Sequence, residues 1–117
     1  MQRELLLLDE MAAAAEQAHR LVEGLTAEEI AGDRVRRDAL LWNFTVLGEA
    51  AAQLPDDLKA RFPLVPWRQP ARLRNRIVHG YWSIDLDILH TTAQTQLPEF
   101  AAAVRRVLAV LTEEAGD

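Results

Sequence analysis

The sequence contains no cysteine. This absence excludes disulfide bonds, thiolate metal sites and a cysteine nucleophile. Long hydrophobic runs are also missing. The longest nearly apolar stretch, from Ala39 to Gly48, is interrupted by two polar residues and is about half as long as a membrane-spanning helix. Glu4 and Asp9 interrupt the N-terminal leucines, so no signal-peptide pattern is present. These features are typical of a cytoplasmic protein.

Acidic residues are missing from one window of an otherwise acidic chain. The net charge of the 117 residues is −5, but the window from Leu58 to Ile84 holds six cationic residues and no aspartate or glutamate. Such a local excess can concentrate an anionic substrate at one face of the molecule. A solvated, arginine-rich helix face explains the same window, so the charge alone does not decide between the two interpretations.

The composition and the apolar periodicity predict helices. Ala, Leu, Glu and Arg dominate, and β-branched residues are sparse. Apolar residues recur at steps of three and four, glycines and prolines separate the segments, and Thr26, Asp33 and Asp85 are placed to cap helix starts. The expected helical segments are 4–23, a short turn after Thr26, 34–54, 55–61, 67–78, 85–97 and 98–113. We therefore expect one all-α domain over residues 1–117, an antiparallel bundle of roughly four to five main helices.

Residues 74–81 carry the side chains best suited to chemistry, in the order Arg-Asn-Arg-Ile-Val-His-Gly-Tyr. Asn75 and His79 are one helical turn apart and share a face, and the long side chain of Arg74 can swing toward it. Arg74 would bind a phosphate oxygen and stabilise the added negative charge of the transition state. His79 would exchange a proton with the 2′-hydroxyl of RNA or with the leaving oxygen, and Asn75 would orient either group.

The same residues also fit an ordinary helix end. Arg74 can pair with Asp85 or with an acid on a helix, and His79 can interact with the C-terminus of its own helix, where a cation is favoured. Tyr81 can be half-buried with its hydroxyl at the surface. The other two histidines have no neighbour at the spacing of metal ligands, so we expect neither a metal site nor a cofactor.

Together with its surroundings, the motif resembles the HepT-type toxins of the HEPN superfamily. Pro66-Trp67 stands just upstream of the motif, and Asp85 follows Tyr81 at the interval seen in that family. Gly48-Glu49-Ala50-Ala51 falls in the second long helical segment. The resemblance covers roughly Asp33 to Pro98, which is most of the chain.

The resemblance implies a helical bundle that dimerises with the motif helices of two subunits facing each other. The paired motifs would form a cleft for metal-independent RNA cleavage, with Arg74, Asn75 and His79 as catalytic residues. The protein would then be the toxin of a type VII toxin–antitoxin system. A minimal nucleotidyltransferase antitoxin of the MntA type would attach AMP to Tyr81, and the added bulk and negative charge would repel RNA.

The same sequence also fits a role without catalysis. A non-catalytic partner subunit could use the arginine-rich face to bind a nucleotide or the nucleotidyltransferase itself. Glu49 is either a buried acid that orients Arg74 from behind or a solvent-facing residue, and Trp67 and Trp82 are expected to pack. The candidate RNA-binding residues are Arg68, Arg72 and Arg76.

Overall fold

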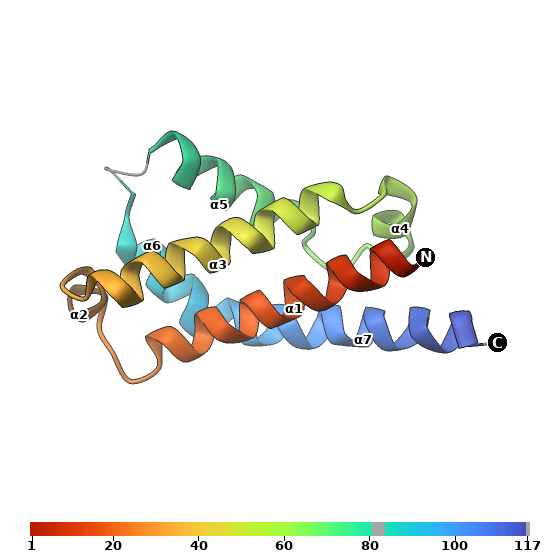
Figure 1. Cartoon of the computed structure of the whole chain (residues 1–117), viewed down its shortest axis with the longest axis horizontal. Helices are drawn as coiled ribbons and strands as arrows, with labels where there is room; N and C mark the ends of the chain where they lie inside the picture. The colour runs from red at the N-terminus through yellow and green to blue at the C-terminus, as the bar shows by residue number, and fades with distance from the viewer. Residues whose placement is uncertain (81–83, 117) are drawn as a thin grey trace.

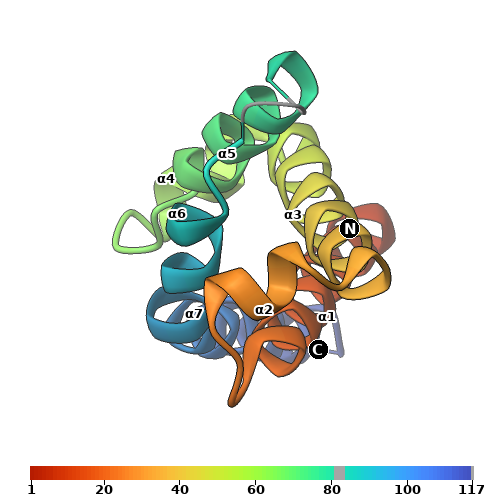
Figure 2. The ribbon, with the colours of Figure 1, turned by 90° about the vertical axis from the view of Figure 1, so that its left-hand side faces the viewer.

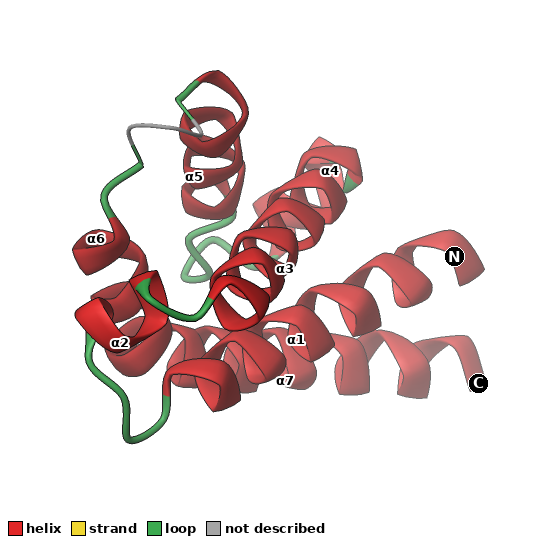
Figure 3. Cartoon of the chain, turned by 60° about the vertical axis from the view of Figure 1, so that its left-hand side comes forward, coloured by secondary structure: helices red, strands yellow, loops and turns green. Residues whose placement is uncertain are grey.

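The long helices of the computed structural model run side by side along its longest axis (Figure 1). The structure describes residues 1–80 and 84–116. The regular elements of these residues are all helical (Figure 3), which confirms the predicted fold class. Their bounds are α1 Gln2–Val22, α2 Ala27–Ala31, α3 Arg34–Gln53, α4 Asp56–Arg61, α5 Arg68–His79, α6 Leu86–Thr91, the π-helical turn η2 Thr92–Gln96 and α7 Leu97–Gly116.

Short polar side chains begin three of these helices, as the sequence predicts. The Thr26 hydroxyl accepts from the backbone N–H of Glu29, and the Glu29 carboxylate accepts from the backbone N–H of Thr26. Asp33 accepts from the N–H three residues on, at the start of α3. Asp85 does the same at α6, from the N–H two residues on. Each cap satisfies a helix-terminal donor and contributes about 1 kcal/mol.

The core lies mainly between α1, α3 and α7. α1 runs antiparallel to both α3 and α7 (Figure 1). Leu8 and Met11 of α1, Phe44 of α3 and Val104 of α7 are completely buried. Burying such a side chain contributes roughly 1.5–3 kcal/mol. α5 packs against α3 and lies at the edge of the bundle (Figure 2), which leaves one side of α5 in solvent.

The C-terminal third of the chain differs from the expectation at Pro98. We expected one helix to end and another to begin there, but α6 and α7 are joined without a break by the π-helical turn. In this turn the N–H of Leu97 donates to the carbonyl of Thr92, five residues back. Pro98, which has no N–H to donate, follows directly after this shift in the hydrogen-bond pattern. Nδ1 of His19 donates to the carbonyl of Ala93 in the same turn, at 3.1 Å.

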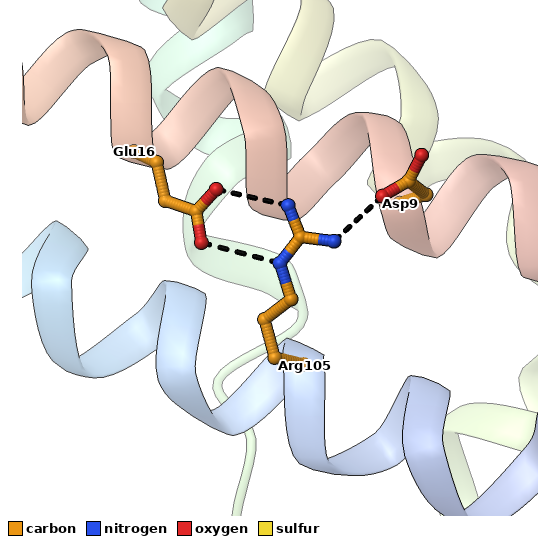
Figure 4. A network of polar contacts seen from close by, with 3 residues as sticks. All are labelled: Asp9, Glu16 and Arg105. Atoms are coloured by element: carbon orange, nitrogen blue, oxygen red, sulfur yellow. Dashed lines mark hydrogen bonds and ion pairs between the residues drawn. The ribbon is translucent and has the colours of Figure 1, made fainter.

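An arginine on α7 links that helix to α1 (Figure 4). Nε and Nη2 of Arg105 donate to the two carboxylate oxygens of Glu16 at 3.2 and 2.9 Å, and Nη1 donates to Asp9 at 2.6 Å. The hydrogen bonds from Arg105 lower the pKa of the Glu16 carboxyl below its ordinary value. No helix in the described part of the chain is both long enough and apolar enough to cross a membrane.

Candidate active site

α5 is the helix that carries the predicted motif, and its two ends are well defined. Trp67, which precedes the helix, is buried, and its indole Nε1 donates to the carbonyl of Phe62 at 2.9 Å. This confirms that Trp67 packs. Pro70 and Ile77 are the buried residues of the helix itself. Gly80 follows the last helical residue.

The outer side of α5 carries a polar stripe, made of Arg68, Arg72, Asn75 and His79. These residues are spaced four, three and four apart, so they lie above one another on one face of the helix. All four are exposed, and Arg76 is exposed beside them. The structure therefore brings Asn75 and His79 together, as predicted, and places two of the candidate RNA-binding arginines in line with them.

Arg74 points in another direction. Five residues along an α-helix correspond to a rotation of about 140°, so Arg74 and His79 leave opposite sides of α5. Nη1 of Arg74 donates to Oε2 of Glu49 on α3, at 2.8 Å. The three-residue cluster around one phosphate that the sequence suggested is therefore not assembled by Arg74, Asn75 and His79 of this one chain. Of the two pairings expected for a structural Arg74, the one with a helix acid is observed, at Glu49, and Asp85 instead caps α6.

Glu49 faces solvent, and the prediction that it is buried is wrong. Its side chain contacts Arg74, yet it is 54% exposed and lies at the surface. It also lines a groove of about 240 Å³ on the outer side of α1 and α3, together with Trp42 and Val46. Trp42 is 65% exposed, which is unusual for so large an apolar side chain. Val78 on α5 is exposed as well.

Lys59 is a residue that the sequence reasoning did not assign to the site. It lines a cleft of about 560 Å³ between α4 and α5 together with Arg68, Arg72 and Asp56. Three cations and one acid thus surround one opening at the start of the polar stripe. The only signal in the sequence was the acid-free window, because a bend of the chain at two prolines separates Lys59 from Arg68.

Several predicted residues have other placements. The predictions for Tyr81 and Trp82 lie outside the described residues. His90, like His19, bonds to a backbone carbonyl, in this case that of Leu25. Within residues 1–80 and 84–116, no three His, Asp or Glu side chains gather closely enough to hold a metal ion.

Comparisons with known proteins place the chain in a class of helical ribonucleases. A family described as Ribonuclease HepT-like matches residues 11–107. A protein of Thermococcus cleftensis named "Probable ribonuclease HepT" is 29% identical over 91 residues, which cover 78% of this chain and 83% of that protein. A "Putative RNase" of Caldanaerobacter subterraneus is 28% identical over 87 residues, covering 74% and 78%. No solved structure matches the chain significantly.

The family match spans most of the chain and includes all of α5. This protein belongs to the HepT-like ribonuclease family, within the HEPN superfamily.

Proposed function

We propose that this protein is a metal-independent endoribonuclease that acts as the toxin of a type VII toxin–antitoxin system. The observation that carries the proposal is the polar stripe of α5, in which His79 and Asn75 are exposed in line with Arg68 and Arg72. Cations along one face can follow an RNA backbone, and an exposed histidine beside them can transfer protons to or from it. Membership of a ribonuclease family supports RNA as the substrate.

The proposed reaction uses the nucleophile that RNA itself provides. The 2′-oxygen attacks the adjacent phosphorus, and the bond from phosphorus to the 5′-oxygen breaks. The products are a 2′,3′-cyclic phosphate and a 5′-hydroxyl. His79 takes the proton of the 2′-hydroxyl or gives one to the leaving 5′-oxygen, and Asn75 orients the reacting groups. Arg74 stabilises the additional negative charge on the phosphate oxygens in the transition state.

This reaction requires a second subunit in our proposal. Arg74 and His79 leave α5 on opposite sides, so one chain cannot easily present both to one phosphate. Two α5 helices that face each other can combine Arg74 of one subunit with His79 of its partner. Trp42 on α3 and Val78 on α5 are large apolar side chains exposed to solvent, and a subunit contact at these two helices would cover them.

The regulatory part of the proposal concerns Tyr81. It follows His79 by two residues, so an AMP group on its hydroxyl would place a negative charge close to the reaction site. A cognate nucleotidyltransferase of the MntA type would add the AMP. RNA phosphate would then be repelled by the modified toxin, which neutralises it.

The test uses protein purified free of its antitoxin, a labelled RNA and EDTA in every reaction. We expect cleavage by the wild type, and a loss of at least about 100-fold in His79→Ala, because general acid–base catalysis contributes that much. Equal cleavage by His79→Ala would show that the catalytic assignment is wrong. If neither protein cleaves RNA but both bind a nucleotide or the nucleotidyltransferase, the function is that of a non-catalytic partner subunit.

Incubation with the cognate nucleotidyltransferase and ATP tests the regulatory part separately. We expect a mass increase in whole AMP units, located at Tyr81 by peptide mass spectrometry. Tyr81→Phe is the matched control, because it removes only the hydroxyl that accepts AMP. An unmodified wild type would contradict regulation at Tyr81 and would leave the ribonuclease assignment intact.

A further inference from the structure

The ion pair between Arg74 and Glu49 joins the motif helix to α3. Nη1 of Arg74 and Oε2 of Glu49 are 2.8 Å apart, which is the length of a charge-assisted hydrogen bond. The Arg74 side chain is only 26% exposed, whereas Glu49 is 54% exposed. Glu49 is therefore the more exposed partner of the pair.

The stem of the same arginine is confined by Gly48. A Cβ atom at this glycine would lie 2.3 Å from Cβ of Arg74 and 2.5 Å from the carbonyl oxygen of Pro70. Backbone and side chain therefore meet here without room for a methyl group. Nε of Arg74 is buried at this contact and has no hydrogen-bond partner among the described residues. The packing thus confines Cβ and Cγ of Arg74, and the guanidinium at the end of this side chain bonds to Glu49.

We infer that Glu49 is a positioning residue for Arg74, an inference that rests on the proposed ribonuclease function. In this inference Glu49 engages Nη1, the packing against Gly48 buries Nε, and a phosphate oxygen of RNA binds at Nη2. An arginine side chain without such contacts would lose conformational entropy when the substrate binds. Here Glu49 holds the guanidinium of Arg74 in one position before RNA binds, so the guanidinium is already oriented for the transition state.

A competing role for Glu49 has the opposite consequence. A carboxylate next to Arg74 could instead repel RNA and keep the enzyme partly inactive. Removing the charge would then raise the activity. Positioning predicts a loss of activity, and it also predicts that an uncharged hydrogen-bond acceptor of the same length preserves most of the function.

The kinetic test compares Glu49→Ala and Glu49→Gln with the wild type on one labelled RNA. We expect Glu49→Ala to lower kcat about 10- to 100-fold, because a small misplacement of a catalytic group costs up to about 100-fold. We expect KM to change less than about threefold, because the backbone phosphates still meet the cations of α5. The amide oxygen of Glu49→Gln can still accept from Nη1, so its kcat should stay within about fivefold of the wild type.

Glu10→Ala is the matched control for this experiment. Glu10 lines the same outer groove as Glu49, so its removal changes the local charge without touching Arg74. We expect wild-type kinetics from Glu10→Ala. Faster cleavage by both Glu49 variants would show that Glu49 restrains the enzyme, and an unchanged kcat in Glu49→Ala would show that it has no role. Either result overturns the inference.

A second measurement does not depend on RNA cleavage. The Nε–H proton of Arg74 should give a sharp, slowly exchanging NMR signal in the wild type, because this atom is buried. The signal should broaden or exchange at least about tenfold faster in Glu49→Ala, and it should persist in Glu49→Gln. If the wild type cleaves no RNA, the proposed function fails while this measurement still tests the positioning. An unchanged signal in Glu49→Ala would contradict the positioning even if the wild type is an active ribonuclease.

Discussion

Replacing Gly48 by alanine tests the contact between α3 and α5 on which the candidate active site depends. In an exposed helix this change stabilises by about 1 kcal/mol, because alanine is the better helix former. At Gly48 the new Cβ would be 2.3 Å from Cβ of Arg74, whereas carbon atoms pack at about 3.5–4.0 Å. The second contact, 2.5 Å from the Pro70 carbonyl oxygen, involves backbone and cannot be relieved by a rotamer change.

The two helices must therefore move apart by about 1 Å or more to admit the methyl group. Overpacking of this kind costs about 1–3 kcal/mol, which exceeds the gain in helix propensity when the cost is at the upper end. We expect Gly48→Ala to lower the free energy of unfolding by up to about 2 kcal/mol and the Tm by up to about 8 °C. Because Arg74 moves with α5, kcat should fall by up to about 100-fold.

Urea unfolding followed by circular dichroism measures the stability, and the RNA cleavage assay measures kcat. Gly32→Ala is the matched control, because the nearest atom to its added Cβ is 3.6 Å away, an ordinary contact distance. That variant should differ little from the wild type. A Gly48→Ala protein as stable and as active as the wild type would refute the reasoning about the α3–α5 contact.

Three further predictions concern the cleft, the link between α1 and α7, and the dimer. Lys59→Ala should remove one phosphate contact to single-stranded RNA. The slope of the logarithm of the binding constant against the logarithm of the salt concentration should then become shallower by about 0.7, and kcat should stay unchanged. Arg105→Ala should destabilise the fold by about 1 kcal/mol at pH 7 in urea unfolding. The folded-state pKa of Glu16 is lowered, so this contribution is present above the ordinary glutamate pKa of about 4.3 and is lost as pH falls through the lowered value. A mixture of inactive Arg74→Ala and inactive His79→Ala should recover about a quarter of the wild-type activity, because random pairing of subunits restores one complete site in half of the dimers.

Each of these predictions has a control or a contrary outcome. Arg34→Ala, which removes an 87% exposed cation at the start of α3, should leave the salt slope unchanged. Arg106→Ala, next to Arg105, should leave both the stability and its pH dependence unchanged. The absence of any recovery on mixing would mean that Arg74 and His79 of the same subunit act together, and the proposed pairing across the dimer would be wrong.

The polar stripe of α5 shows how far sequence reasoning reaches. The predicted helix 67–78 agrees with the observed Arg68–His79 within one residue at each end. Asn75 and His79 share a face because a spacing of four residues places them there in any α-helix. The exposure of the stripe also follows from the pattern, since the apolar residues of α5 lie elsewhere on the helix.

The direction of Arg74 did not follow from the sequence. The sequence allowed Arg74 either to reach a phosphate beside Asn75 or to be oriented by Glu49, and the contact with α3 directs it to Glu49. That contact requires Gly48, which is 26 positions earlier in the chain, to lie against α5. Lys59 was missed for a similar reason, because only the folded chain brings it beside Arg68 and Arg72.

The sequence by itself determined the all-α class, the helix caps at Thr26, Asp33 and Asp85, and the chemical character of α5. These properties depend on interactions within one or two helical turns, so neighbouring residues are sufficient to define them. Tertiary structure alone decided the continuous helix through Pro98, the cleft that contains Lys59 and the bond from Arg74 to Glu49. These features depend on how separate helices pack and on which residues meet where they cross, and local spacing does not contain that information.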